Sequence, residues 1–284
     1  MENFFERNLT INCSGRLVSL EKPTVMGIVN VTPDSFYDGG KYNNTLSTVL
    51  KQVEKHLEEG ATFIDVGGYS SRPNAKNVSV EVELNRVLPV IKEIVKVFPD
   101  ALVSIDTFRS EVARQSINEG ASLVNDISAG NLDAEMPKTV ANLQVPYIAM
   151  HMKGTPQTMQ QNPIYNDVVE DLIYFFSKKI DGFNQLGIND VILDVGFGFG
   201  KTVEDNYRLL KHLDRFKLFK IPILVGISRK SMLYKPLDIS PEQALNATTV
   251  AHTVALQNGA NILRAHDVKE AVEAIHLVEE LNFV

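Results

Sequence analysis

Eight short apolar runs, separated by longer segments with helical periodicity, constrain this chain more than any other feature. The runs are apolar on both faces instead of alternating, which is typical of parallel strands covered on both sides. Each run ends at or just before a polar residue or a glycine. The predicted strands are 25–29, 63–66, 102–105, 123–124, 147–150, 191–195, 223–226 and 262–265.

The segments between these strands carry apolar residues every three or four positions, which predicts amphipathic helices. Several of them stop at a glycine, as in EEGATFID and QNGANILRA, and glycine after a helix turns the chain into the next strand. This order predicts an α/β fold, a (β/α)8 TIM barrel, with an open doubly wound sheet as the alternative. The predicted helices are 45–59, 80–97, 109–119, 133–142 (the weakest pattern), 168–186, 203–213, 243–258 and 267–281.

Two further features concern the organisation of the chain. Residues 9–22 alternate weakly around Ser14–Gly15, which predicts a short N-terminal β-hairpin. No low-complexity or Pro/Ser-rich linker divides the sequence, so we expect one domain over residues 1–284.

Composition narrows the class of protein. The net charge is −7 and no cluster of five Lys or Arg occurs, which argues against nucleic acid or an anionic membrane as the main partner. The single cysteine, Cys13, excludes an intramolecular disulfide and is not expected to be a nucleophile. The first residues lack a signal-peptide pattern, and no apolar run approaches the ~18 residues of a membrane span. We therefore expect a soluble, cytoplasmic protein.

Polar residues stand where the predicted strands end. In a barrel the carboxyl ends of the strands meet at one face, which predicts a single site there. Acidic residues at strand ends can instead cap the following helix, an alternative that fits Asp65 and Asp126 best. Capping does not account for a Lys, an Arg and a His at the same end. The residues expected at this face are Asn30, Asp65, Asp106, Asn125, Asp126, His151, Asp194, Lys230, Arg264 and His266.

Four of these residues suit a flat heterocycle. Asp106 and Asp194 follow apolar strands, and one carboxylate accepts two parallel N–H groups from an amidine-like edge. Asn125 both donates and accepts, and Lys230 adds an ammonium group. The two aspartates could also bind a divalent metal, although no third acid has ligand-like spacing.

The last strand carries a possible phosphate site. Arg264 and His266 are two residues apart, so both would point the same way, in the region where barrels of this kind often bind phosphate. The alternative is an Arg–Asp pair at the barrel rim.

Two glycine-bearing loops allow further interpretations. The sequence GFGFGKT at 196–202 fits neither nucleotide-loop pattern; we expect Phe197 or Phe199 to flank a flat ligand. The loop at 67–74 is either a lid that contacts an anion or a simple mobile turn.

Eight phrases, in this order, are similar to those of the dihydropteroate synthase family over essentially the whole chain. They are MGIVNVTPDSFYDGG, FIDVGGYSSRP, SIDTFRSEVA, VNDISAG, AMHMKGTPQTMQ, ILDVGFGFGK, VGISRKSML and HTVALQNGANILRAHDV. The resemblance implies a (β/α)8 barrel that joins 6-hydroxymethyl-7,8-dihydropterin diphosphate to 4-aminobenzoate on the folate route, releasing pyrophosphate and forming 7,8-dihydropteroate. It also implies sulfonamide competition, a Mg²⁺ cofactor and a homodimer.

The same resemblance implies a role for each matching residue. Those implied to hold the pterin or line its slot are Asp106, Asn125, Met150, Asp194, Phe199 and Lys230. Those implied at the diphosphate are Asn30, which also contacts Mg²⁺, Arg264 and His266. Those implied on the aminobenzoate side are Ser71, Arg72, Pro73 and Ser231. The catalytic set comprises Asp106, Asp194, Lys230 and Asp34, which helps to order the reacting complex.

Three positions depart from the family pattern: Tyr37 replaces a serine, Tyr69 a glutamate and Asn74 a common glycine. A pterin-binding methyltransferase is an alternative enzyme, but VTPDSF, SSRP and RAHD favour the synthase. A catalytically silent paralogue is a third possibility. It would be free to lose Arg72, Lys230 or Arg264, and all three are present.

Overall fold

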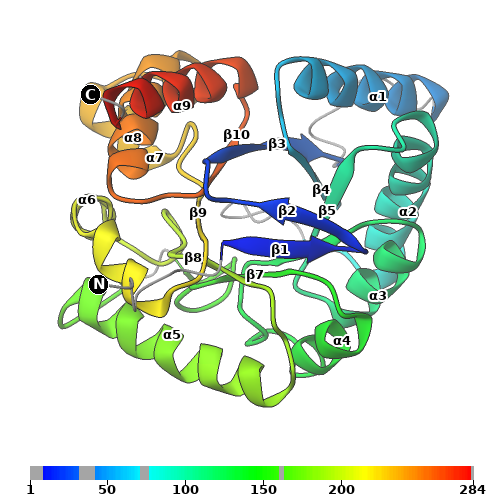
Figure 1. The fold of residues 1–284 in the computed structure, drawn as a ribbon, viewed down its shortest axis with the longest axis horizontal. Coiled ribbons are helices and arrows are strands. Elements are labelled where there is room, and N and C mark those ends of the chain that lie inside the picture. The colour runs from blue at the N-terminus through cyan, green and yellow to red at the C-terminus, as the bar shows by residue number, and fades with distance from the viewer. Residues whose placement is uncertain (1–8, 32–41, 71–76, 160–162, 283–284) are drawn as a thin grey trace, which may run out of the picture.

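The computed structural model describes residues 9–31, 42–70, 77–159 and 163–282. Eight parallel strands close into a barrel in the order β10-β3-β4-β5-β6-β7-β8-β9, and helices form a ring around it (Figure 1). Closure confirms the predicted (β/α)8 barrel and rules out the open sheet. The barrel strands are β3 (Thr24–Asn30), β4 (Phe63–Gly67), β5 (Leu102–Asp106), β6 (Leu123–Asp126), β7 (Tyr147–Met150), β8 (Val191–Asp194), β9 (Ile223–Val225) and β10 (Ile262–Ala265).

The eight predicted helices are present with small changes at their ends. The helix predicted from 133 begins at Met136, because Asp133 accepts hydrogen bonds from the backbone N–H groups of Ser110 and Glu135 ahead of it. The short helix α7 and the 3-10 turn over Leu213–Phe219 were not predicted, since neither is long enough to show periodicity. The helices are α1 (Tyr42–Glu58), α2 (Val80–Val97), α3 (Ser110–Asn118), α4 (Met136–Leu143), α5 (Val168–Gln185), α6 (Val203–Lys211), α7 (Ser231–Tyr234), α8 (Leu245–Gln257) and α9 (Val268–Asn282).

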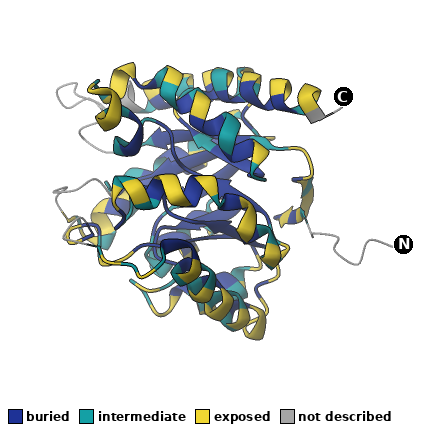
Figure 2. Cartoon of the chain, turned by 90° about the vertical axis from the view of Figure 1, so that its left-hand side faces the viewer, coloured by how far each residue is buried: buried dark blue, intermediate teal, exposed yellow. Residues whose placement is uncertain are grey.

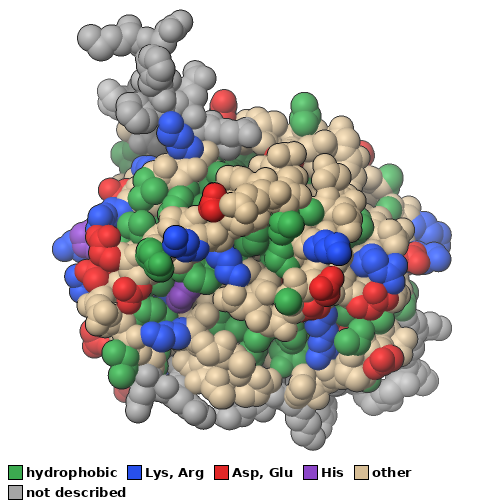
Figure 3. All heavy atoms as spheres, turned by 90° about the horizontal axis from the view of Figure 1, so that it is seen from below, with side chains coloured by type: hydrophobic (Ala, Val, Ile, Leu, Met, Phe, Trp, Pro, Cys, Tyr) green, Lys and Arg blue, Asp and Glu red, His purple; other side chains and the backbone are tan. Residues whose placement is uncertain are grey.

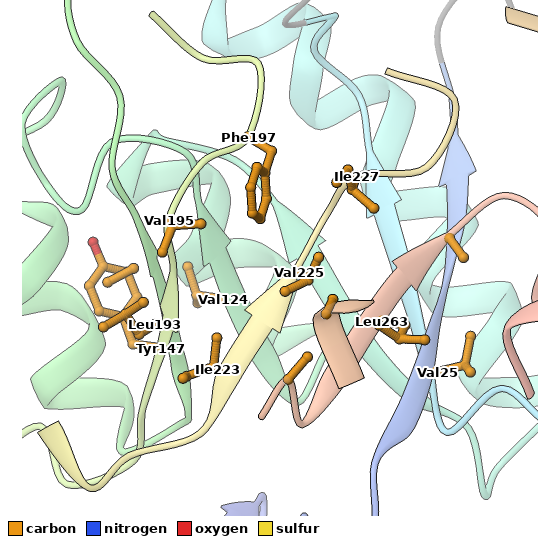
Figure 4. Packing of buried hydrophobic residues seen from close by; sticks show 14 of the residues in the cluster. Val25, Val124, Tyr147, Leu193, Val195, Phe197, Ile223, Val225, Ile227 and Leu263 are labelled. Atoms are coloured by element: carbon orange, nitrogen blue, oxygen red, sulfur yellow. The ribbon is translucent and has the colours of Figure 1, made fainter. Parts of the chain in front are cut away.

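Side chains alternate between the outside and the inside of the barrel along each strand. The outward side chains, among them Val25, Val124, Leu193 and Val225, pack in the layer between strands and helices (Figure 4). Figure 2 shows the result from the side: buried strands between helices whose outer faces are exposed. Apolar side chains on both faces of the sheet explain why the sequence shows continuous apolar runs.

The predicted hairpin covers the amino-terminal end of the barrel. Strands β1 (Thr10–Cys13) and β2 (Arg16–Ser19) pair antiparallel, and they lie across the centre of the barrel in Figure 1. Ser14 and Gly15 both have positive φ, as a two-residue hairpin turn requires. The hairpin and the inward side chains form one apolar floor, which consists of Ile11, Cys13, Leu20, Met26, Phe63, Leu102, Leu123, Ile148, Ile192, Leu224 and Ile262.

Charged side chains of both signs are interspersed on the face shown in Figure 3. Two ion pairs near α5 join it to α6 and the following turn: Arg208 with Asp167 at 2.6 Å and Arg215 with Glu170 at 2.5 Å. Exposed pairs each contribute only about 0–1 kcal/mol, so burial of the apolar layers dominates stability. Within the described ranges, no helix is long and apolar enough to cross a membrane.

The apolar floor should contribute strongly to stability. Leu20 is fully buried in it, so Leu20→Ala should lower the free energy of unfolding by about 2–5 kcal/mol. Leu17 in the same hairpin is 72% exposed, and Leu17→Ala is the matched control, expected within about 0.5 kcal/mol of the parent. Denaturant titration measures both; similar losses in the two variants would contradict this role.

Candidate active site at the carboxyl ends of the barrel strands

A charged layer lies directly above the apolar floor. Asp65, Asp194 and Arg264 each stand two residues after an inward residue of the floor, so they point to the inside of the barrel. We call the polar residues gathered here the mouth cluster: Asp65, Asp106, Asn125, Asp194, Lys230 and Arg264.

Arg264 is the centre of this cluster. Its Nε donates to Asp65 Oδ2 at 2.6 Å and its Nη2 donates to Asp106 Oδ2 at 2.7 Å. Burial opposes the charge of Arg264, but the two carboxylates together raise its pKa above the ordinary value. Asp65 Oδ2 also accepts from Asn125 Nδ2 at 3.0 Å. Asn125, Asp65, Arg264 and Asp106 therefore form one hydrogen-bonded chain, and each of the four residues comes from a different strand.

Asp194 faces Arg264 across an open position. A Cβ atom on Gly226 would lie 3.8 Å from Asp194 Oδ2 and 3.9 Å from Arg264 Cδ. Glycine here leaves room between an anion and a cation. Gly67 leaves room beside Asp106, where a Cβ would lie 3.4 Å from the Asp106 Cβ. Asp194 Oδ1 accepts from the backbone N–H of Gly196 at 2.8 Å, which fixes the carboxylate. Burial raises the pKa of Asp194, while Lys230 opposes the shift.

Lys230 approaches the cluster from the turn into α7. Its Nζ donates to the backbone carbonyl of Phe197 and lies 4.5 Å from the centroid of the Phe199 ring. Burial lowers the pKa of Lys230 to about 8, although the charge of Asp194 acts in the opposite direction. Phe199 packs against the apolar group that contains Met150 and Met152, so one wall of the site is apolar.

The two phenylalanines predicted to flank a flat ligand differ in burial and packing. Phe197 is fully buried and belongs to the outward apolar layer (Figure 4). Phe199 is half-buried next to Lys230 and Met150. Of the two rings, only that of Phe199 lies beside the mouth cluster.

Two residues expected to share the site stand at the carboxyl ends of β6 and β7, as predicted, but their side chains point away from the barrel interior. Asp126 points outward and accepts from the Tyr147 hydroxyl at 2.7 Å and from the Gly130 backbone N–H at 2.7 Å, so it shapes the loop after β6. His151 packs edge-on against Phe175 of α5, with ring centroids 4.8 Å apart. Asp65, in contrast, lies in the mouth cluster as expected. It binds Arg264 and Asn125 inside the barrel, and the alternative that it caps the next helix is excluded because the N-cap of α2 is Ser79.

The other predicted residues lie around the rim. Asn30 ends β3 beside Gly67 and is half-buried, and Ser231 begins α7 directly after Lys230. His266 is exposed, and its Nδ1 lies 3.0 Å from Ser228 Oγ. The rim ion pair that the sequence offered as an alternative does exist, but it joins Asp267 to Arg229 through two bonds of 2.8 Å. Arg264 does not take part in this rim pair; its partners, Asp65 and Asp106, lie inside the barrel.

Several predicted positions lie outside the described residues: Asp34, Tyr37, Ser71, Arg72, Pro73 and Asn74. Tyr69, the third departure from the family pattern, is described. It is largely buried, its hydroxyl accepts from Gln157 Nε2 at 2.8 Å, and its ring meets Phe108 edge-on at 5.0 Å. The tyrosine therefore packs between the loops that follow β4, β5 and β7.

Sequence reasoning missed the buried Lys201. Its Nζ donates to the carbonyls of Gly196 at 2.9 Å and Phe199 at 3.0 Å and lies 3.0 Å from His151 Nδ1. Burial lowers the pKa of Lys201 to about 7. The residue fastens the loop after β8 to the end of β7. A lysine inside a glycine-rich phrase that is not a nucleotide loop was the only signal.

The chemistry of the described residues narrows the possible ligands. Burial raises the pKa of Cys13 to about 12, so its thiol is not a nucleophile at neutral pH. Across the described ranges, no group of three or more His, Cys, Asp or Glu side chains has metal-binding geometry. The mouth cluster instead presents carboxylate, amide and cationic groups beside an apolar wall, which suits a planar heterocycle with N–H donors.

Comparison with known proteins also identifies relatives that bind a planar heterocycle. Residues 26–266 match the family model of pterin binding enzymes. The chain is 44% identical over 271 residues to dihydropteroate synthase of Escherichia coli K12, covering 93% of this chain and 94% of that protein. It is 41% identical to the dihydropteroate synthase of a Synechocystis species, covering 90% and 89%.

Solved structures agree. The Yersinia pestis dihydropteroate synthase in complex with a sulfonamide drug superimposes with a TM-score of 0.91 at 42% identity, covering 97% of this chain and all of that chain. The Xanthomonas albilineans enzyme with 4-aminobenzoic acid gives 0.90 at 39% identity, covering 97% and 99%. Both the sequence and the barrel are thus matched over nearly their full length, and the chain belongs to the dihydropteroate synthase family.

Proposed function

We propose that this enzyme condenses 6-hydroxymethyl-7,8-dihydropterin diphosphate with 4-aminobenzoate, forming 7,8-dihydropteroate and pyrophosphate in folate biosynthesis. The observation that carries the proposal is the convergence of Asp106, Asn125, Asp194 and Lys230 inside one barrel around Arg264. A related Xanthomonas albilineans enzyme is known in complex with 7,8-dihydropteroate, at 38% identity and a TM-score of 0.87.

The mouth cluster would bind the pterin ring. Asp106 and Asp194 accept N–H groups from its edge, and Asn125 and Lys230 complete the polar contacts. Phe199 and Met150 line the apolar wall. The ring would occupy the space that Gly67 and Gly226 leave without side chains.

The diphosphate would extend from Arg264, inside the barrel, to His266 and Asn30 at the rim. Mg²⁺ fits this place only as a metal shared with the substrate, because Asn30 offers a single amide oxygen there. Mg²⁺ commonly keeps few protein ligands and takes the rest from phosphates and water. When bound, it would neutralise charge on the leaving pyrophosphate.

In the mechanism we propose, breaking of the C–O bond to the diphosphate runs ahead of attack by the arylamine. The dihydropterin can stabilise a carbocation at its exocyclic methylene, and ionised Asp106 and Asp194 favour that cation. Arg264 and His266 stabilise the departing anion. The arylamine is already nucleophilic, so a strong general base is not required. Exclusion of water protects the cation.

The remaining roles rest on the family resemblance. We propose that Ser71, Arg72, Pro73 and Ser231 bind 4-aminobenzoate, and that Asp34 helps to order the reacting complex. Sulfonamides would then compete with 4-aminobenzoate at this side.

We also propose a cytoplasmic homodimer. Exposed apolar side chains at Tyr207, Leu237 and Val250 (43%, 58% and 59% exposed), near α6 to α8, support a contact between two copies. Light scattering coupled to size exclusion would determine the mass of the assembly.

A coupled pyrophosphate assay with mass detection of dihydropteroate tests the function. Pyrophosphate should appear with both substrates and fall sharply when 4-aminobenzoate is omitted. Lys230→Ala should lower kcat/KM by about 100-fold, because it removes a buried charged donor. Lys211→Ala, at an exposed lysine of α6, is the control. Full turnover with unchanged pterin affinity in Asp194→Asn would refute the site.

The pH dependence of kcat/KM for the pterin substrate tests two ionisation states. Burial raises the pKa of Asp106 to about 7, so activity should fall below that pH as the carboxylate gains a proton. Burial lowers the pKa of Lys230 to about 8, so activity should also fall above that pH as the ammonium loses one. Lys230→Arg should move the alkaline limb upward and leave the acid limb in place; an unmoved alkaline limb contradicts the assignment.

Removal of Mg²⁺ tests the proposed cofactor. Excess EDTA should lower the rate at least about tenfold, and added Mg²⁺ should restore it. Asn30→Ala should raise the Mg²⁺ concentration that gives half-maximal rate, while the binding of 6-hydroxymethylpterin, which lacks the diphosphate, stays unchanged. Full activity of the metal-stripped enzyme would exclude the cofactor.

A further inference from the structure

Asp65 has no role in the proposed chemistry, yet its carboxylate contacts two residues that do. The side chain is fully buried in the middle of β4. Its Oδ2 accepts from both Arg264 Nε at 2.6 Å and Asn125 Nδ2 at 3.0 Å. A buried carboxylate is costly unless it is hydrogen-bonded, so these two side chains and Asp65 constrain one another.

The contact with Arg264 determines how much of Asp106 remains available. Guanidinium and carboxylate groups favour a two-bond pairing along one edge. Here the Nε–Nη2 edge of Arg264 is instead divided between Asp65 and Asp106, and Asp106 uses only Oδ2. Without Asp65, the Nε–H and Nη2–H groups of Arg264 could both donate to Asp106. Both oxygens of Asp106 would then be occupied, and neither could accept from a ligand.

The contact with Asn125 determines which end of the amide faces the ligand. An ionised carboxylate only accepts hydrogen bonds, so the amide nitrogen of Asn125 must face Asp65. The amide oxygen is then directed the other way. Asp65 thus fixes a hydrogen-bond acceptor of the site as well as a cation.

We propose that Asp65 is a positioning residue for the pterin end of the site, because its carboxylate takes the Nε–H of Arg264, so that Arg264 binds Asp106 through one N–H only, and because it sets the orientation of the Asn125 amide. The identity of the ligand rests on the proposed function, whereas the contacts among Asp65, Arg264, Asp106 and Asn125 are independent of it.

A double-mutant cycle tests the coupling, with 6-hydroxymethylpterin as a fluorescent binding probe. Asp65→Ala should weaken its binding by about 10- to 100-fold. Asp65→Asn should weaken it less, because an amide oxygen still accepts from both donors. In an Arg264→Gln background the effect of Asp65→Ala should shrink at least about threefold, since there is no guanidinium left to hold. The KM for 4-aminobenzoate should change less than about twofold.

Two controls separate positioning from a general loss of stability. Ser104 is the inward neighbour of Asp65 in register on β5, and within the described residues its Oγ has no hydrogen-bond partner, so Ser104→Ala should bind normally. Asp126 is a fully buried carboxylate on the outward face, so Asp126→Asn should lower stability and change probe affinity by less than about twofold.

The acid limb of the pH profile gives a second readout. The charges that act on Asp106 come from Arg264, Asp65, Glu83 and Asp126, and the negative charge of Asp65 raises the pKa of Asp106. Asp65→Asn should therefore move the acid limb to lower pH. Asp126→Asn removes a charge with a smaller effect on Asp106 and should move the limb less; equal shifts in the two variants would show only the loss of a nearby charge.

Independent effects of Asp65 and Arg264, or a loss in Ser104→Ala equal to that in Asp65→Ala, would overturn the proposal. If Asp65→Ala does not fold, the same double-mutant cycle with Asp65→Asn and Arg264→Gln tests whether the two positions are coupled. If the wild-type protein binds the probe but releases no pyrophosphate, the proposed function fails while the cycle still reports on Asp65.

Discussion

In a closed barrel every strand residue faces one of two environments, because its side chain points either outward to the helices or inward to the barrel interior. Three carboxylates and two cations point inward above a dry apolar floor, where water is scarce and charges must satisfy one another. Arg264 meets most of that requirement by pairing with Asp65 and Asp106. The surplus of negative charge favours a ligand that brings N–H donors or develops a positive charge during reaction. The chemistry proposed for the site follows from this balance.

The same interior that supports the chemistry does not favour stability. Buried ion pairs seldom repay their desolvation in full, and here Asp194 and Lys230 both have pKa values shifted toward their neutral forms by burial. The hairpin and the outward layer have to compensate. Function and stability are thus divided between the two ends of the barrel, as is usual for this architecture.

The sequence predicted the architecture well because apolar runs, helical periodicity and glycine stops all indicate local structure. It could not sort residues by face. Strands covered on both sides show no alternation, so Asp65 inside and Asp126 outside looked alike, and Phe197 could not be told from Phe199. Pairings such as Arg264 with Asp65, 199 residues apart in the chain, were also beyond a single sequence. The residue types of the site came from the pattern and the family resemblance; their partners came only from the fold.

Lys201 has a further consequence for how a ligand is received. By holding the carbonyls of Gly196 and Phe199, it keeps the turn after β8 in one shape, and that turn supplies both the aromatic wall and the Phe197 carbonyl that contacts Lys230. A ring entering the barrel therefore meets a surface that is already assembled and loses little affinity to the entropy of ordering it. A lysine that is bonded to the loop backbone, and not aimed into the mouth cluster, would in this way raise the affinity of the site for its ligand.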